Sequence, residues 1–72
     1  MIFDYDKLKG RIVEKYSTRT AFAEAAGFSK GQLHCRLNNK TPFKSEEIVV
    51  TCDLLSIPAD QIGTYFFTVK VR

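Results

Sequence analysis

Apolar side chains recur at helical spacing through most of this 72-residue chain. Leu8, Ile12 and Tyr16 repeat every four residues, so they define one face of a first predicted helix that opens beside Asp4 and Asp6. Acidic side chains are favoured there because the amino end of a helix carries partial positive charge. The start of the chain therefore predicts a helix that packs against the rest of the domain.

Two short helices separated by a glycine turn are predicted between residues 18 and 38. The first passes from hydroxyl side chains through an alanine-rich segment to Gly27, which can adopt the left-handed conformation that ends a helix. The second begins at Ser29, because its hydroxyl and the Gln32 amide have the spacing of a capping box. A short helix, a glycine turn and a second helix with a polar outer face form the helix-turn-helix plan.

The last third of the chain predicts a fourth helix, a shorter fifth helix and an extended end. Ser45 is expected to cap the fourth helix, and Pro58 stands where the first turn of the fifth would begin. From Phe67 to Val71 apolar residues alternate with polar ones, which is the periodicity of a strand. The inner stripe of the fourth helix is predicted to consist of Ile48, Val49, Cys52 and Leu55.

One compact all-α domain of four to five helices over residues 1–72 accounts for this pattern, with residues 65–72 as a short C-terminal strand or extended tail. The chain is 44% hydrophobic and 26% charged, a composition typical of a globular domain. Its length leaves room for one core, which excludes most enzyme folds. No segment approaches the roughly 20 apolar residues of a membrane span, so no membrane contact is expected.

Positive charge is concentrated in the middle of the chain. The net charge is +3, and residues 1–16 contribute +1, residues 17–44 contribute +4 and residues 45–72 contribute −2. The basic excess therefore coincides with the predicted helix-turn-helix, as in a domain that contacts nucleic acid.

The sequence offers no constellation for catalysis or metal binding. His34 and Cys35 are neighbours on a predicted helix, so they point about 100° apart and cannot act as a dyad. One histidine and two isolated cysteines are too few for a closed zinc site, and the glycines form no phosphate loop. We therefore expect a non-enzymatic protein without a cofactor. The sparse cysteines and the absence of a signal-peptide pattern predict a cytoplasmic location.

The segment TAFAEAAGFSK at residues 20–30 resembles the helix-turn-helix core of the phage repressor and Cro family. The runs LNNKTPF at 37–43, EEI at 46–48, IP at 57–58 and YFF at 65–67 resemble a subgroup of small Cro-like regulators from phages and prophages of Gram-positive bacteria. The resemblance covers nearly the whole chain. It implies a lambda-repressor-like DNA-binding domain and a transcriptional regulator that occupies double-stranded operator DNA.

In that family the second helix of the motif lies in the major groove. Gly31 and Cys35 depart from the pattern, because neither side chain reaches a base from the middle of the outer face. The resemblance implies base contacts from Ser29, Lys30, Gln32, His34, Arg36 and Asn38, with Arg36 open to either base or phosphate. It implies phosphate contacts from Thr18, Arg19, Thr20, Asn39, Lys40 and Lys44.

The tail at residues 65–72 is too apolar to stay unpaired. Three pairings are open: a second copy in a homodimer, the chain's own residues 1–3, and a partner protein. The alternative function is a modulator or antirepressor that binds a phage repressor protein through the helix-turn-helix face or through this tail. The candidate interface residues in the tail are Phe66, Phe67, Val69 and Val71.

Overall fold

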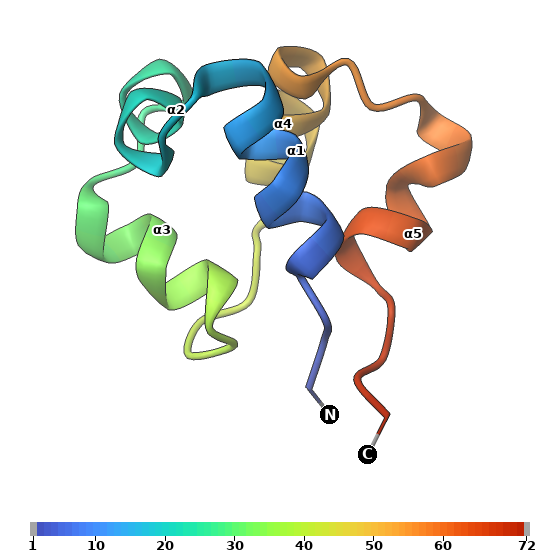
Figure 1. Cartoon of the computed structure of the whole chain (residues 1–72). Coiled ribbons are helices and arrows are strands. Elements are labelled where there is room, and N and C mark those ends of the chain that lie inside the picture. The colour runs from blue at the N-terminus through green and yellow to red at the C-terminus, as the bar shows by residue number, and fades with distance from the viewer. Residues whose placement is uncertain (1, 72) are drawn as a thin grey trace.

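The computed structural model describes residues 2–71, which form five α-helices and one 3-10 turn around a single core (Figure 1). The all-α fold predicted from the apolar pattern is confirmed. None of the helices in this part of the chain is long and apolar enough to span a bilayer. The elements are α1 (Asp6–Tyr16), α2 (Arg19–Ala26), α3 (Lys30–Leu37), α4 (Ser45–Leu55), η1 (Ala59–Gln61) and α5 (Ile62–Phe66).

The ends of α2 and α3 follow the sequence signals. The Thr18 hydroxyl accepts a hydrogen bond from the Ala21 N–H at 3.1 Å and so caps α2. Gly27 ends that helix with a φ of 82°, in the left-handed region that favours glycine. At the start of α3, the Ser29 hydroxyl accepts from the Gln32 N–H at 3.1 Å, while the Gln32 side chain accepts from the Ser29 N–H at 2.9 Å. The predicted capping box is confirmed.

Helix α4 differs from its prediction at both its cap and its inner face. Lys44, and not Ser45, is the capping position, and its N–H donates to the Glu47 carboxylate at 2.8 Å. Val49 is 61% exposed, whereas Thr51 is fully buried. The inner stripe therefore runs through positions 48, 51, 52 and 55. These positions have the i, i+3, i+4, i+7 spacing of a buried face, and the predicted stripe through position 49 covered a face rotated toward solvent.

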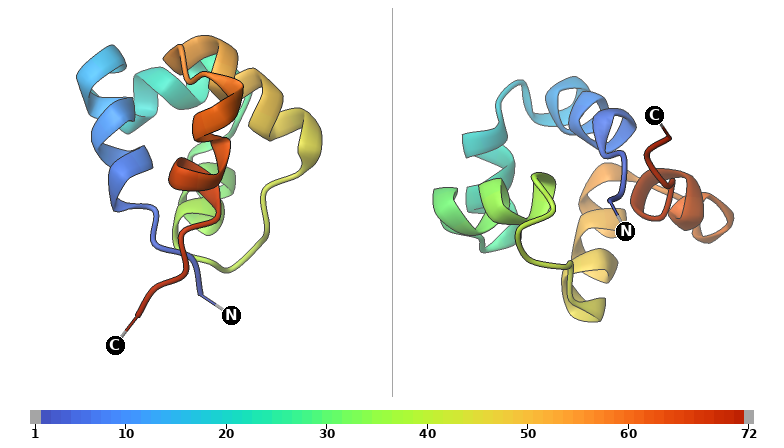
Figure 2. Two further views of the ribbon diagram at one scale, coloured as in Figure 1. Left: turned by 90° about the vertical axis from the view of Figure 1, so that its right-hand side faces the viewer. Right: turned by 90° about the horizontal axis from the view of Figure 1, so that it is seen from below.

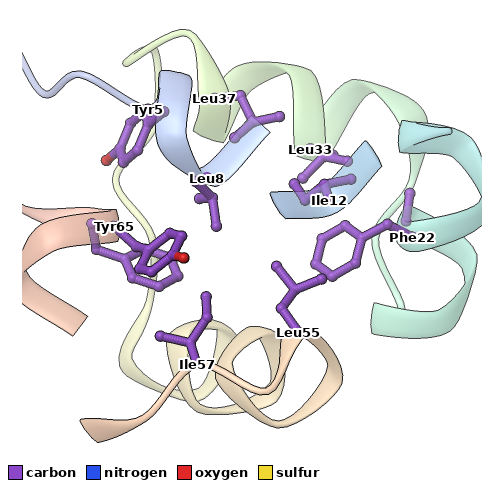
Figure 3. Close-up of a cluster of buried hydrophobic side chains, with 11 residues drawn as sticks. Tyr5, Leu8, Ile12, Phe22, Leu33, Leu37, Leu55, Ile57 and Tyr65 are labelled. Atoms are coloured by element: carbon purple, nitrogen blue, oxygen red, sulfur yellow. The ribbon is translucent and has the colours of Figure 1, made fainter. Parts of the chain in front are cut away.

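The core gathers around Leu8 and Ile12 of α1, with buried side chains from the other four α-helices beside them (Figure 3). Leu8 and Ile12 are completely buried, as their spacing predicted. Phe66 is 1% exposed and belongs to this core, so its assignment to the interface of the tail is wrong. The other buried hydrophobic residues are Tyr5, Phe22, Ala23, Leu33, Leu37, Leu55, Ile57 and Tyr65.

Phe43 connects parts of the chain that are distant in sequence. Its ring centroid lies 5.4 Å from that of Tyr5, 5.1 Å from that of Phe66 and 6.5 Å from that of Phe28, each with a T-shaped arrangement. Edge-to-face pairs of this kind add favourable electrostatics to the apolar area that they bury. One ring therefore joins the N-terminal segment, the turn before α3 and the last helix.

The two ends of the chain lie side by side (Figures 1 and 2). Phe3 and Val69 form an isolated antiparallel bridge, and the Asp4 N–H donates to the Thr68 carbonyl at 2.7 Å. The predicted terminal strand is thus a single bridge followed by extended chain. Of the three pairings that the sequence left open, the structure contains the one with the chain's own N-terminal segment.

Asn39 holds the N-terminal segment from its other side. Its Oδ1 accepts from the Phe3 N–H, and its Nδ2 donates to the Phe3 carbonyl, both at 2.9 Å. Asn39 has a φ of 61°, a conformation that asparagine tolerates better than most residues. Asn39 was predicted to contact DNA phosphate. Its side chain instead bonds the backbone of the N-terminal segment, as a neighbouring strand would.

Asn39→Asp tests this role. An aspartate keeps an acceptor for the Phe3 N–H but has no proton for the Phe3 carbonyl, so we expect a loss of about 1 kcal/mol in stability. Hydrogen exchange at the Asp4 and Lys70 amides should accelerate, while the amides of α2 keep their protection. Asn39→Gly, which retains the positive φ but loses both bonds, should give the same local change. Unaltered exchange in both variants would contradict the role.

Thr51 carries the one buried side-chain oxygen or nitrogen without a hydrogen-bond partner among residues 2–71. An unsatisfied buried hydroxyl is destabilising, and valine has nearly the same shape. Thr51→Val should therefore raise the free energy of unfolding by about 1 kcal/mol, measured by urea denaturation. The exposed Thr64→Val serves as the matched control and should leave stability nearly unchanged. A destabilised T51V protein would mean that the hydroxyl is bonded in solution.

Candidate functional site

A shallow hollow of about 270 Å³ separates α2 from α3 on the helix-turn-helix surface. Its floor contains Ala23 and Leu33, which are 3% and 2% exposed. Arg19, Lys30 and His34 form a cationic rim. The structure thus brings together four of the residues predicted to contact DNA, since Thr20 also lines the hollow, whereas Lys40 and Lys44 do not.

Several polar side chains of the predicted recognition face are engaged inside the chain. Ser29 and Gln32 complete the capping box of α3. The Asn38 Nδ2 donates to the His34 carbonyl at 2.8 Å and lies 3.3 Å from the His34 ring nitrogen Nδ1. Asn39 is bound to the N-terminal segment. These amides and hydroxyls have partners already, which leaves few free polar groups on α3 to read a base edge.

Arg36 is placed very differently from the base or phosphate contact that the resemblance implied. It is 7% exposed, and its Nε and Nη2 donate to the two Glu47 carboxylate oxygens at 3.0 and 2.9 Å. The guanidinium carbon also lies 6.0 Å from the centre of the Phe28 ring. The planar guanidinium matches the carboxylate with two parallel bonds, which makes burial of the charge tolerable. Arg36 therefore joins α3 to α4 and does not project outward.

The hydrogen bonds from Arg36 hold the pKa of the Glu47 carboxyl below its usual value, although burial acts in the opposite direction. The Lys44 N–H also favours the charged carboxylate. The same pairing raises the pKa of Arg36. Arg36 and Glu47 are thus both ionised at neutral pH, and each neutralises the charge of the other.

Apart from Val13 on α1, the exposed large apolar side chains of residues 2–71 lie at two other places. On α4, Val49 and Val50 are 61% and 39% exposed and are flanked by Glu46 and Asp53. These four positions share one helical face, a surface that the sequence analysis missed because it placed Val49 in the core. The spacing of 46, 49, 50 and 53 is the signal that would have identified it. At the chain ends, the exposed large hydrophobic residues are Ile2, Phe67, Val69 and Val71.

The two cysteines are free and half-buried. Burial raises the pKa of the Cys52 thiol, with a smaller contribution from Asp53, so this thiol is less reactive than an exposed one. In the described part of the chain, no three His, Cys, Asp or Glu side chains are placed to hold a metal ion.

Comparison with known proteins places the chain in a family. The model of the family described as "Protein of unknown function (DUF739)" matches residues 1–69. The chain belongs to this family. The solution structure of the modulator of repression (MOR) of the temperate bacteriophage TP901-1 from Lactococcus lactis is similar over 100% of this chain and 97% of the other, with 38% sequence identity and a TM-score of 0.83. No curated protein matches the chain at a significant level.

These matches correct the functional prediction. The family is DUF739 and not the phage repressor and Cro family, and the full-length similarity is to a phage modulator of repression. The prediction of a Cro-like repressor that occupies operator DNA is therefore wrong. Neither match supports binding to DNA or a homodimer through the tail. The geometry of α3 supplies a physical reason, because Arg36 is buried and its polar neighbours are engaged within the chain.

Glu47→Gln tests the buried ion pair. Glutamine keeps the size of the side chain but leaves the Arg36 charge buried without a counter-charge, so we expect a loss of about 3 kcal/mol in unfolding free energy at pH 7. Glu46→Gln is the matched control one residue away on the exposed side of α4 and should stay within about 0.5 kcal/mol of the parent. Equal effects of the two substitutions in urea denaturation would argue against the pair.

The pH dependence has a defined sign. Because the pKa of Glu47 is lowered in the folded state, its stabilising contribution is fully present above the unfolded carboxyl pKa of about 4.3 and is lost as the pH falls through the folded value. The parent should therefore lose more stability between pH 5 and pH 3 than E47Q loses. Parallel stability curves for both proteins would contradict this assignment.

Proposed function

We propose that this protein is a phage-encoded modulator of repression that acts by binding a phage repressor protein. The observation that carries the proposal is the similarity to the phage TP901-1 modulator, which extends over the full chain at 38% identity. The activity is recognition of a protein partner, with no catalytic step. Its setting is the control of lysogeny, where a repressor holds lytic genes silent.

The distribution of exposed apolar area supports a protein partner. The floor of the hollow between α2 and α3 is almost fully buried, so it has little apolar surface to offer. Val49 and Phe67, by contrast, are more than half exposed, on α4 and at the chain end. Burial of apolar area is the main source of affinity between proteins, whereas DNA binding depends chiefly on phosphate contacts. The exposed groups of this chain suit the first kind of partner better.

The direct test is titration of the purified protein into the repressor of the same phage, by isothermal calorimetry. We expect a saturable complex with a dissociation constant of about 1 µM or lower, the weaker end of ordinary protein interfaces. In parallel, fluorescence anisotropy should show that the protein alone binds promoter DNA no better than a scrambled duplex. A repressor from an unrelated phage serves as the control. Absence of heat or of complex with the matching repressor would overturn the proposal.

A further inference from the structure

The paired ends of the chain form a small ribbon, here called the terminal ribbon, from residues 2–4 and 68–70. Phe3 and Val69 face each other at its centre. The hydrogen bonds lie on either side of this pair: one joins Asp4 to residue 68, and the Lys70 N–H donates to the Ile2 carbonyl at 2.8 Å. In such a non-hydrogen-bonded pair, the N–H and C=O groups of the two facing residues point away from each other, toward the two outer edges.

One outer edge is closed. The outward N–H and C=O of Phe3 are both bound by the amide of Asn39, at 2.9 Å each. A side-chain amide presents one acceptor and one donor in the arrangement that a neighbouring strand would offer. The N-terminal segment is therefore satisfied on both of its sides.

The opposite edge is open. Within residues 2–71 neither the N–H nor the C=O of Val69 has a hydrogen-bond partner, and the residue is 46% exposed. Phe67 and Val71, two positions to either side, are 51% and 87% exposed. An exposed edge with free backbone groups and alternating apolar side chains is a template for another strand. Val69 offers the same pair of groups that Phe3 offers to Asn39.

Charge distinguishes between the candidate occupants of this edge. After Asp60 the chain has two basic residues, Lys70 and Arg72, and no acidic one. Two copies paired edge to edge would set two strands side by side that each carry Lys70 and no acidic residue, so the new edge would gather positive charge without a counter-charge. An extended segment that carries acidic side chains between apolar ones would instead complement Lys70. The edge therefore favours a segment of a different protein.

We propose that Val69 is the docking point for an extended, acidic and apolar segment of the partner repressor, which adds a third strand to the terminal ribbon. This inference rests on the proposed function for the identity of the partner. The backbone groups of Val69 supply the hydrogen bonds, the exposed Phe67 and Val71 supply apolar contact, and Lys70 supplies charge complementarity. Asn39 keeps the ribbon in place from the opposite side.

Hydrogen exchange on the unaltered protein gives the first test. On saturation with the repressor, the Val69 amide should exchange at least tenfold more slowly, whereas the Asp4 and Lys70 amides, which are already bonded, should change little. An unchanged rate at Val69 in a saturated complex would overturn the docking point while leaving the proposed function intact. Protection of Val69 that grows with the concentration of this protein alone would overturn the choice of occupant, because it would indicate a second copy.

A backbone substitution gives the second test. Replacement of the Val69 N–H by an ester oxygen, introduced by chemical ligation at Cys52, removes one hydrogen-bond donor without altering any side chain. We expect repressor binding to weaken at least tenfold, with unchanged exchange at Lys70, whose N–H donates to Ile2. Exchange at Asp4 should rise modestly, because the ester also makes the Thr68 carbonyl a weaker acceptor for the Asp4 N–H. Val69→Ala, which keeps the backbone donor, should weaken binding less than the ester does. An ester that binds as tightly as the parent would overturn the proposal, and failure of the parent itself to bind would instead count against the proposed function.

Discussion

The ion pair between Arg36 and Glu47 is the constraint that ties the fold of this chain to the chemistry of its surface. It joins α3 to α4 across a loop, and it is largely shielded from water, so each charge is stable only because the other is present. Glu47 also accepts the Lys44 N–H, so one carboxylate both starts α4 and holds α3. The same pair withdraws an arginine from the outer face of the helix-turn-helix. One contact therefore links α3 to α4 and limits what the helix-turn-helix surface can bind.

Aromatic contacts extend this arrangement through a chain with room for a single core. The Arg36 guanidinium lies over Phe28, Phe28 meets Phe43, and Phe43 meets Tyr5 and Phe66. Large rings are effective in a small domain because each buries much apolar area without requiring many residues. The network brings both chain ends against the helix-turn-helix, and so places the terminal ribbon that carries the proposed docking point at Val69.

The helix-turn-helix fold of this chain does not by itself decide what the chain binds. Its caps, its glycine turn and its cationic rim all satisfy the plan of a DNA-binding motif. A fold nevertheless supports many activities, which depend on the side chains placed upon it. In this chain Arg36 is buried, and Gln32 and Asn38 bond to their own helix. Lys30 and His34 are therefore the polar side chains of α3 that remain available, while valine side chains on α4 and the tail face solvent. This distribution of exposed side chains agrees better with the similarity to a modulator of repression than with operator binding.

Local signals in the sequence determined the helices, the Gly27 turn, the capping box of Ser29 and Gln32, and the burial of Leu8 and Ile12. Such features depend on residues that lie within one or two helical turns of each other. Only the tertiary structure decided the inward turn of Arg36, the exposure of Val49, the burial of Phe66 and the clamp formed by Asn39. Each of these depends on a partner more than ten residues away or on which helical face meets α1. Periodicity locates a helical face within about one residue, and a shift of one residue turns it by about 100°. That rotation is enough to exchange a core position for an exposed one.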